Sequence, residues 1–373
     1  MTTAARGVYV HIPFCIVRCG YCDFNAYAGM DELADPYVDA LLKEIDDRAD
    51  GGVVTTVFFG GGTPTQLPPE QLGRIVQRIR ERFEVTSGVE ITVEANPETL
   101  EPGVASGLLE NGFNRISIGV QSTSAKVLQQ LERVHSSDRA IRALECAVAA
   151  GFERVNADLI YGTPGETMQE WRASLARVLA TGVTHVSAYA LTVEEGTPLS
   201  LKVARGDLPA PDEDDLADKY DLLVETLRDA GLERYEVSNF AREGHECMHN
   251  IGYWKGADYF GFGAGAHSHR AGRRSWNVRL PRTYIDRSPS VEDGFETLEP
   301  EQRRGEAAVL ALRLAQGIRR KDFSQMWGSD PVELWPGPIA GGADGGILHV
   351  DDDTVRCTDK GFLLMDGVAR ELV

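Results

Sequence analysis

The chain has 373 residues, enough for one large α/β domain and a smaller one at roughly 100–200 residues per domain. Hydrophobic residues make up 42% and charged residues 25%, which excludes a disordered chain. The formal net charge of −19 opposes a nucleic-acid partner, and no apolar run reaches the roughly 20 residues of a membrane span. We therefore expect a cytoplasmic protein with no nucleic-acid partner and no transmembrane segment, while a peripheral membrane contact stays open.

Strands and helices are predicted to alternate over the first half of the chain. Strands are expected at 7–12, 53–59, 89–93, 115–120, 154–160 and 185–191, and helices at 31–50, 68–83, 101–111, 124–150 (interrupted near 134–137) and 167–180. Each return to a parallel strand needs a crossover, so this alternation predicts a parallel sheet. Six strand-first units are too few for a closed eightfold barrel.

The repeat ends after residue 198, and three parts of the chain are expected. Residues 1–240 form the core domain, 241–300 a connecting region, and 301–373 a small C-terminal α+β domain. Helices are predicted at 212–230 and over the apolar run 307–314. The segment between these helices contains Gly-rich loops and short strands.

Three cysteines, Cys15, Cys19 and Cys22, follow the first strand in a C-x3-C-x2-C array. Three thiolates can hold three irons of a four-iron cluster and leave one iron open to the amine and carboxylate of S-adenosylmethionine. One alternative is a structural zinc with His11 or Asp23 as fourth ligand, and another is three inert thiols. Zinc sites usually come as two ligand pairs, and no second pair follows here.

Polar or glycine residues stand at the ends of four successive predicted strands. They are the run Gly60–Pro64, Glu94, Gln121 and Asp158. In parallel α/β barrels the functional residues gather at the C-terminal ends of strands. Buried polar groups need partners, so these residues are expected to meet a ligand or one another.

A second group of unusual residues lies between His245 and Trp254 and includes Cys247, His249 and Tyr253. Imidazole, thiolate and thioether groups can ligate haem iron, and aromatic rings can line a porphyrin slot. The absence of C-x2-C-H excludes ordinary c-type attachment. The alternative is a capped turn whose aromatic residues fill the core.

The run Tyr-x-His-x-Pro-Phe-Cys-x3-Cys-x-Tyr-Cys-Asp-Phe, residues 9–24, resembles the signature of the radical S-adenosylmethionine superfamily, in the branch of the HemN and HemW proteins. The resemblance implies a partial (β/α)6 TIM-type barrel, a winged-helix-like C-terminal domain and a [4Fe-4S] cluster on the three cysteines. It places S-adenosylmethionine contacts at Tyr9, Tyr21, Gly61, Gly62, Thr63, Glu94, Gln121, Arg133 and Asp158.

The segment His249-Asn-x2-Tyr253-Trp254 resembles the HNxxYW motif that is characteristic of HemW proteins. The coproporphyrinogen dehydrogenases of this branch carry a further cysteine where this chain has Phe24, and a longer segment before the cluster. The resemblance therefore implies a haem chaperone that binds haem through His249, Tyr253 and Trp254 and passes it to an unidentified acceptor protein. No residue is assigned a catalytic role.

Two other functions stay as alternatives. One is an oxygen-independent coproporphyrinogen III dehydrogenase that uses radical S-adenosylmethionine chemistry. The other is a radical enzyme that modifies nucleic acid, which the charge of −19 disfavours. Because a carrier must release its cargo, we expect His249, the preferred axial ligand with Cys247 or His245 as substitutes, to lie in an exposed site.

Overall fold

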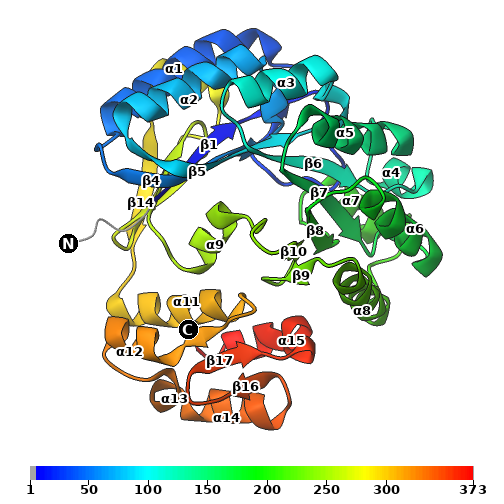
Figure 1. The fold of residues 1–373 in the computed structure, drawn as a ribbon, viewed down its shortest axis with the longest axis vertical. Coiled ribbons are helices and arrows are strands. Elements are labelled where there is room, and N and C mark those ends of the chain that lie inside the picture. The colour runs from blue at the N-terminus through cyan, green and yellow to red at the C-terminus, as the bar shows by residue number, and fades with distance from the viewer. Residues whose placement is uncertain (1–5, 373) are drawn as a thin grey trace.

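The computed structural model describes residues 6–372, and most of their strands join one open twelve-stranded sheet (Figure 1). Its order is β14-β13-β12-β11-β1-β4-β5-β6-β7-β8-β10-β9. The central strands are β1 (Arg6–Ile12), β4 (Val53–Gly61), β5 (Glu84–Ala95), β6 (Arg115–Gln121), β7 (Arg154–Tyr161) and β8 (His185–Ala190). Neighbours among these six pair in parallel, which confirms the predicted six-unit sheet.

Helices cover the outer, convex side of the sheet (Figure 1). They are α1 (Ala34–Arg48), α2 (Pro69–Arg82), α3 (Pro102–Glu110), α4 (Ala125–Gln130), α5 (Ser137–Ala150) and α6 (Met168–Leu179). The predicted interruption before residue 137 is confirmed. It arises because Ser136 caps α5 by accepting the backbone N–H of Arg139, which starts a new helix. A capping box of Thr167 and Glu170 begins α6 in the same way.

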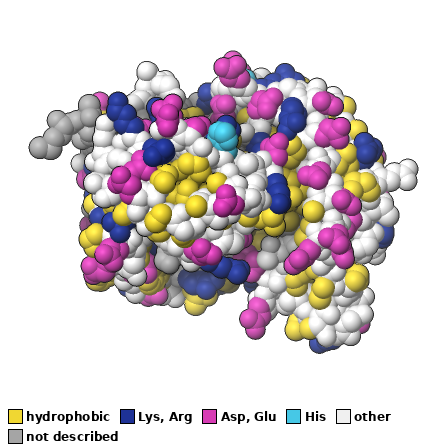
Figure 2. Space-filling model, turned by 90° about the horizontal axis from the view of Figure 1, so that it is seen from below, with side chains coloured by type: hydrophobic (Ala, Val, Ile, Leu, Met, Phe, Trp, Pro, Cys, Tyr) yellow, Lys and Arg dark blue, Asp and Glu magenta, His cyan; other side chains and the backbone are white. Residues whose placement is uncertain are grey.

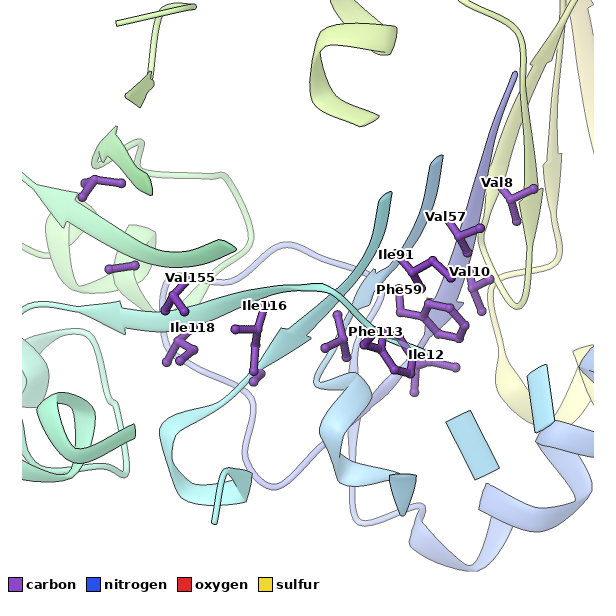
Figure 3. Close-up of a cluster of buried hydrophobic side chains, with 14 of the residues drawn as sticks. Val8, Val10, Ile12, Val57, Phe59, Ile91, Phe113, Ile116, Ile118 and Val155 are labelled. Atoms are coloured by element: carbon purple, nitrogen blue, oxygen red, sulfur yellow. The ribbon is translucent and has the colours of Figure 1, made fainter. Parts of the chain in front are cut away.

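The two faces of the parallel strands differ in chemistry. Residues that point to the helices are apolar and buried, as Figure 3 shows for Val8, Val10, Ile12, Val57 and Phe59. Because side chains alternate along a strand, the residues between them face the concave side. These are Tyr9, His11, Thr56, Phe58, Glu90, Thr92, Glu94, Arg115, Ser117, Asn156, Asp158, His185 and Ser187. The core that stabilises the sheet thus lies on its convex side, and polar groups fill the concave side.

Short strands extend the sheet at both ends. β11 (Tyr259–Phe262) pairs in parallel with β1, and β12 (His267–Arg270), β13 (Arg273–Asn277) and β14 (Glu292–Thr297) follow it in antiparallel fashion. β10 (Asn239–Ala241) and β9 (Glu233–Arg234) extend the other end. The sequence predicted short strands in this region but did not predict where they join the sheet. The helices here are α7 (Pro198–Ala204), α8 (Glu213–Asp229), α9 (Met248–Trp254) and α10 (Pro281–Arg287).

The C-terminal segment forms a separate small layer below the main sheet in Figure 1. Its helices are α11 (Pro300–Leu312), α12 (Arg320–Trp327), α13 (Pro331–Leu334), α14 (Pro336–Asp344) and α15 (Asp359–Ala369). Its strands β15 (Ile318–Arg319), β16 (Leu348–Val350) and β17 (Thr354–Cys357) form an antiparallel sheet in the order β15-β17-β16. The expected α+β module is confirmed. Strands from residues 241–300 belong to the main sheet. The domain boundaries stay a prediction.

Candidate functional site

A cavity of about 440 Å³ opens at the C-terminal ends of the central strands. It brings together most of the residues singled out in the sequence. The lining includes Cys15, Cys19, Tyr21, Cys22, Gly61, Gly62, Thr63, Glu94, Gln121, Arg133 and Asp158. Tyr9 is not among the lining residues. Its ring stacks on Phe58, and its hydroxyl pairs with His11 Nδ1 at 2.9 Å.

The glycine run after β4 packs directly against the cysteine loop. Gly62 N–H donates to the carbonyl of Ile12 (2.9 Å), and Thr63 N–H donates to the carbonyl of Phe14 (2.7 Å). A Cβ at position 62 would lie 2.6 Å from Phe14 O and 3.1 Å from Cys15 Sγ. Only glycine therefore allows this approach. The short strands β2 (Phe14–Cys15) and β3 (Tyr27–Ala28) pair to close the loop.

The three clustered thiols are free and half-buried. Burial raises the pKa of Cys15, and burial raises that of Cys22 to about 11. Within residues 6–372, no three His, Cys, Asp or Glu side chains lie close enough to share a single metal ion. Both nitrogens of His11 are engaged, Nδ1 with Tyr9 and Nε2 with the carbonyl of Asn25. These thiols therefore fit a cluster, where each binds its own iron, better than one zinc ion.

Two arginines line this cavity, the exposed Arg18 and the partly buried Arg133. Arg133 Nη1 donates to Cys19 Sγ (3.2 Å), and its Nη2 donates to the carbonyl of Gly119 (2.9 Å). Its Nε is buried and has no hydrogen-bond partner among the described residues. A buried donor without a partner is costly, so this group fits an acceptor supplied by a ligand, such as a carboxylate.

Two carboxyl groups, Glu94 and Asp158, also line the cavity. Glu94 Oε2 accepts the N–H of Gly61 (3.1 Å), and Asp158 Oδ2 accepts the hydroxyl of Ser117 (2.9 Å). Burial and then the charge of Asp158 raise the pKa of Glu94 to about 8. Gln121 stands beside them with a φ of +63°, a strained value that is typical of functional positions. A cationic, hydrogen-bonding ligand would suit this pair.

Glu94 gives a pH-dependent prediction for the protein without its cluster. Because its pKa of about 8 in the folded chain exceeds its ordinary value of 4.5, the folded state binds the extra proton. The resulting stability is complete below about pH 4.5 and is lost as pH rises through about 8. Between those limits the free energy of unfolding should fall, relative to Glu94→Gln, by at least about 1.4 kcal/mol, the value of one pKa unit.

Urea unfolding across this pH range measures the difference, with Glu70→Gln, an exposed carboxyl in α2, as the matched control. The control should follow the wild type at every pH. If the free energy of unfolding of the wild type has the same pH dependence as that of Glu94→Gln, Glu94 carries no excess proton in the folded state.

A second cavity, of about 460 Å³, opens at the opposite, N-terminal ends of the strands and is bordered by α9. His249 and Tyr253 line it, but the expected exposure of His249 is wrong. Its side chain is buried, with 3% exposed, because Gly7 leaves room for the ring: a Cβ there would lie 3.0 Å from His249 Cε1. Glu90 fastens the start of α9 by accepting the N–H groups of Met248 and His249.

Both ring nitrogens of His249 already have partners. Nδ1 pairs with the hydroxyl of Thr56 and Nε2 with that of Tyr253, each at 2.9 Å, while the ring stacks on Phe58. Burial and then the positive charge of Arg115 lower the pKa of His249 to about 3. The imidazole is therefore neutral, as an iron ligand must be, but it has to release Tyr253 before Nε2 can bind a metal.

The remaining residues of this motif have different surroundings. Trp254 is not among the residues that line the second cavity, and Arg313 lies over its ring at 5.4 Å. Cys247 is buried, and burial raises the pKa of its thiol to about 12, which disfavours a thiolate ligand. Trp254 is only partly buried, and through Arg313 it contacts the region next to α11 rather than the second cavity.

Sequence reasoning missed the polar side chains between the two cavities: Glu90, Arg115, Ser117, Asn156 and His185. A signal was present, because β5 to β8 alternate apolar and polar residues strictly, as in Arg-Ile-Ser-Ile-Gly of β6. Parallel strands covered on both faces usually form continuous apolar runs. The alternation therefore indicated a functional concave face.

Comparisons with known proteins agree with this geometry. The profile of the Radical SAM superfamily matches residues 9–178, and that of the HemN C-terminal domain matches residues 298–364. The solved structure of coproporphyrinogen III oxidase (HemN) from Escherichia coli, described as a radical SAM enzyme, aligns with a TM-score of 0.86 and 25% identity. The alignment covers 99% of this chain and 90% of that one. The fold is that of the radical SAM superfamily, and membership of this superfamily implies a [4Fe-4S] cluster and S-adenosylmethionine.

Curated relatives narrow the assignment. A protein of Mycobacterium tuberculosis named "Heme chaperone HemW" is 41% identical over 376 residues, covering 98% of this chain and 94% of its own. A Bacillus subtilis protein of the same name is 36% identical over 372 residues, covering 97% and 98%. The chain belongs to the HemW family.

Proposed function

We propose that the protein is a haem chaperone that holds a [4Fe-4S] cluster and S-adenosylmethionine in the first cavity and haem at the second. The observation that carries this proposal is the second cavity itself, which the HNxxYW helix borders at the ends of the strands opposite to the cysteines. The names of the relatives support haem as cargo. We propose that an acceptor protein takes the haem from this chaperone. We expect the chaperone and the acceptor to lie in the cytoplasm.

The first cavity offers a role for each of its polar groups. Cys15, Cys19 and Cys22 would hold three irons, and the fourth iron would supply an open coordination position for S-adenosylmethionine. Arg133 lines the cavity and would pair with the methionine carboxylate, and Glu94 and Asp158 can accept from its amine or the ribose hydroxyls. Tyr9 does not line the cavity, so it would support the ligand site through its hydrogen bond to His11 rather than by direct contact.

The second cavity has the chemistry that a porphyrin carboxylate needs. Arg6, Arg154 and Lys255 line it and could pair with propionates, while Ile251 contributes apolar surface. Met248, 48% exposed on the same helix, presents a thioether, and His249 lies next to it. Openness on one side suits a carrier that must hand over its cargo.

Two other functions are less well supported. Phe24 stands where the dehydrogenase branch carries a further cysteine, and its side chain is 65% exposed at the first cavity. The fold does not separate the two functions, since HemN shares it. An anaerobic assay of reconstituted protein with coproporphyrinogen III should therefore yield no protoporphyrinogen. For nucleic acid, Figure 2 shows acidic and basic side chains intermixed on the face seen from below, with no broad basic surface.

Haem titration tests the second cavity. We expect Met248→Ala and His249→Ala each to weaken haem binding at least tenfold, about 1.4 kcal/mol. The variant that lacks the axial ligand should also show a changed Soret band. The matched control is Met326→Ala, a methionine 71% exposed in the C-terminal module. Unchanged affinity and spectrum in both cavity variants would contradict this placement of haem.

Stability has to be measured beside affinity, because His249 is buried against Phe58, Thr56 and Tyr253. Truncating a buried ring typically costs about 3 kcal/mol. A His249→Ala protein that melts several degrees lower and yet binds haem normally would identify the histidine as structural only.

A further inference from the structure

A line of hydrogen bonds crosses the concave face of the sheet from the first cavity to α9. Asn156 Nδ2 donates to Asp158 Oδ1 (2.8 Å), and Asn156 Oδ1 pairs with His185 Nδ1 (2.6 Å). His185 Nε2 pairs with the hydroxyl of Tyr235 (2.8 Å), whose oxygen accepts the backbone N–H of Cys247 (3.4 Å). Cys247 is the N-cap residue, directly before α9. The line joins a carboxylate of one cavity to the helix of the other.

The bonding partners fix the direction of every hydrogen bond in this line. Three acceptors lie within reach of the two hydrogens on Asn156 Nδ2: Asp158 Oδ1 (2.8 Å) and the hydroxyls of Ser117 (2.6 Å) and Ser187 (2.9 Å). Its Oδ1 is therefore the acceptor, and His185 Nδ1 must donate. Burial lowers the pKa of His185 well below its usual value, which keeps the ring neutral. Its Nε2 then accepts from Tyr235. All donors therefore point from α9 towards Asp158, and such aligned bonds polarise one another.

The carboxylate at the end of the line is held on both oxygens. Ser117 donates to Asp158 Oδ2 (2.9 Å), while Asn156 donates to Oδ1. Asn156 and His185 are almost completely buried, with 1% exposed each. A ligand that bonds to Asp158 must therefore change the strength or geometry of bonds that continue to α9, since the buried side chains have no room to absorb the change.

We propose that Asn156, His185 and Tyr235 are positioning residues that couple ligand occupancy at Asp158 to the placement of α9. Coupling is reciprocal, so a ligand at α9 alters the affinity for S-adenosylmethionine by the same factor. The inference rests on the proposed function only in assigning α9 to haem. The coupling itself concerns this chain's own hydrogen bonds.

Tyr235 is a suitable junction for such coupling because three parts of the chain meet at it. Its side chain bonds β8 through His185 and the start of α9 through Cys247. Its backbone carbonyl accepts the N–H of Ala315, just after α11 of the C-terminal module. Removing the hydroxyl alone would cut the line and leave the backbone contacts in place.

Hydrogen–deuterium exchange of the reconstituted protein, with and without S-adenosylmethionine, reads the coupling without haem. In the wild type the ligand should slow exchange of the backbone amides of α9 by about fivefold or more, the lower range of measured couplings. Tyr235→Phe should reduce this change to less than twofold, as should His185→Gln, which interrupts the line one residue further on. The control is Tyr161→Phe, a buried tyrosine that packs on Trp171, which should behave as the wild type.

Haem affinity with and without S-adenosylmethionine supplies the second measurement. In the wild type S-adenosylmethionine should change the haem affinity by about fivefold or more, and haem should change the affinity for S-adenosylmethionine by the same factor. Tyr235→Phe should show neither change. Equal slowing of α9 in wild type and both line variants, or no slowing in the wild type, would overturn the coupling even if haem binds. Slowing that depends on Tyr235 in a protein that binds no haem would instead overturn the proposed cargo and leave the coupling standing.

Discussion

Replacing Cys15, Cys19 and Cys22 together by alanine is expected to abolish iron and sulfide binding after anaerobic reconstitution. The wild type should hold about four irons and four sulfides, since the three thiols surround one cavity and the other cysteines lie outside it. The loss should be complete because Arg133, Thr63 and the glycine turn can hold the loop in shape but cannot ligate iron.

Colorimetric iron and sulfide analysis, with the absorption spectrum of the cluster, measures this result. Cys146→Ala, on α5 of the convex side, is the matched control and should retain the full content. Full retention in the triple variant would exclude the cluster site. Retention of one metal ion without sulfide would instead support the zinc alternative.

Arg133→Ala is expected to weaken binding of S-adenosylmethionine by at least about thirtyfold. Removing one partner of a partly buried charge pair costs about 2 kcal/mol or more, and Arg133 is a partly buried cation that lines this cavity. Arg133→Lys should recover part of the loss, because it keeps the charge but not the planar set of donors. Equilibrium dialysis or calorimetry on cluster-loaded protein measures the affinity.

Iron content has to be equal in these variants, because Arg133 also donates to Cys19 Sγ. Arg139→Ala is the control, an arginine on α5 that pairs with Glu101 outside the cavity. Wild-type affinity in an Arg133→Ala protein with a full cluster would remove Arg133 from the binding site.

The sequence predicts the parallel half of the fold well because its signals are local. Each of the six strands is a short apolar or alternating run, and serine or threonine marks the starts of α5 and α6. The first cavity was predictable for the same reason. Once strands are parallel, residues at their C-terminal ends must meet, so Glu94, Gln121 and Asp158 could be placed together without knowing any distance.

The parts that could not be predicted depend on contacts between distant segments. β11 lies beside β1 although about 250 residues separate them, and a four-residue strand carries little pattern of its own. The burial of His249 likewise depends on space left by Gly7 and on hydrogen bonds with Thr56 and Tyr253. These partners cannot be predicted from the residues of the HNxxYW segment alone.

The division of each strand into an apolar convex face and a polar concave face has an evolutionary consequence. Folding depends on residues such as Ile116 and Val155, whereas ligand chemistry depends on their neighbours Ser117 and Asn156. Because neighbouring side chains on a strand point to opposite faces, a substitution on the concave side need not touch the apolar side chains packed under the helices. A barrel of this kind can exchange one cargo or reaction for another by mutating alternate positions, with no new fold to be found.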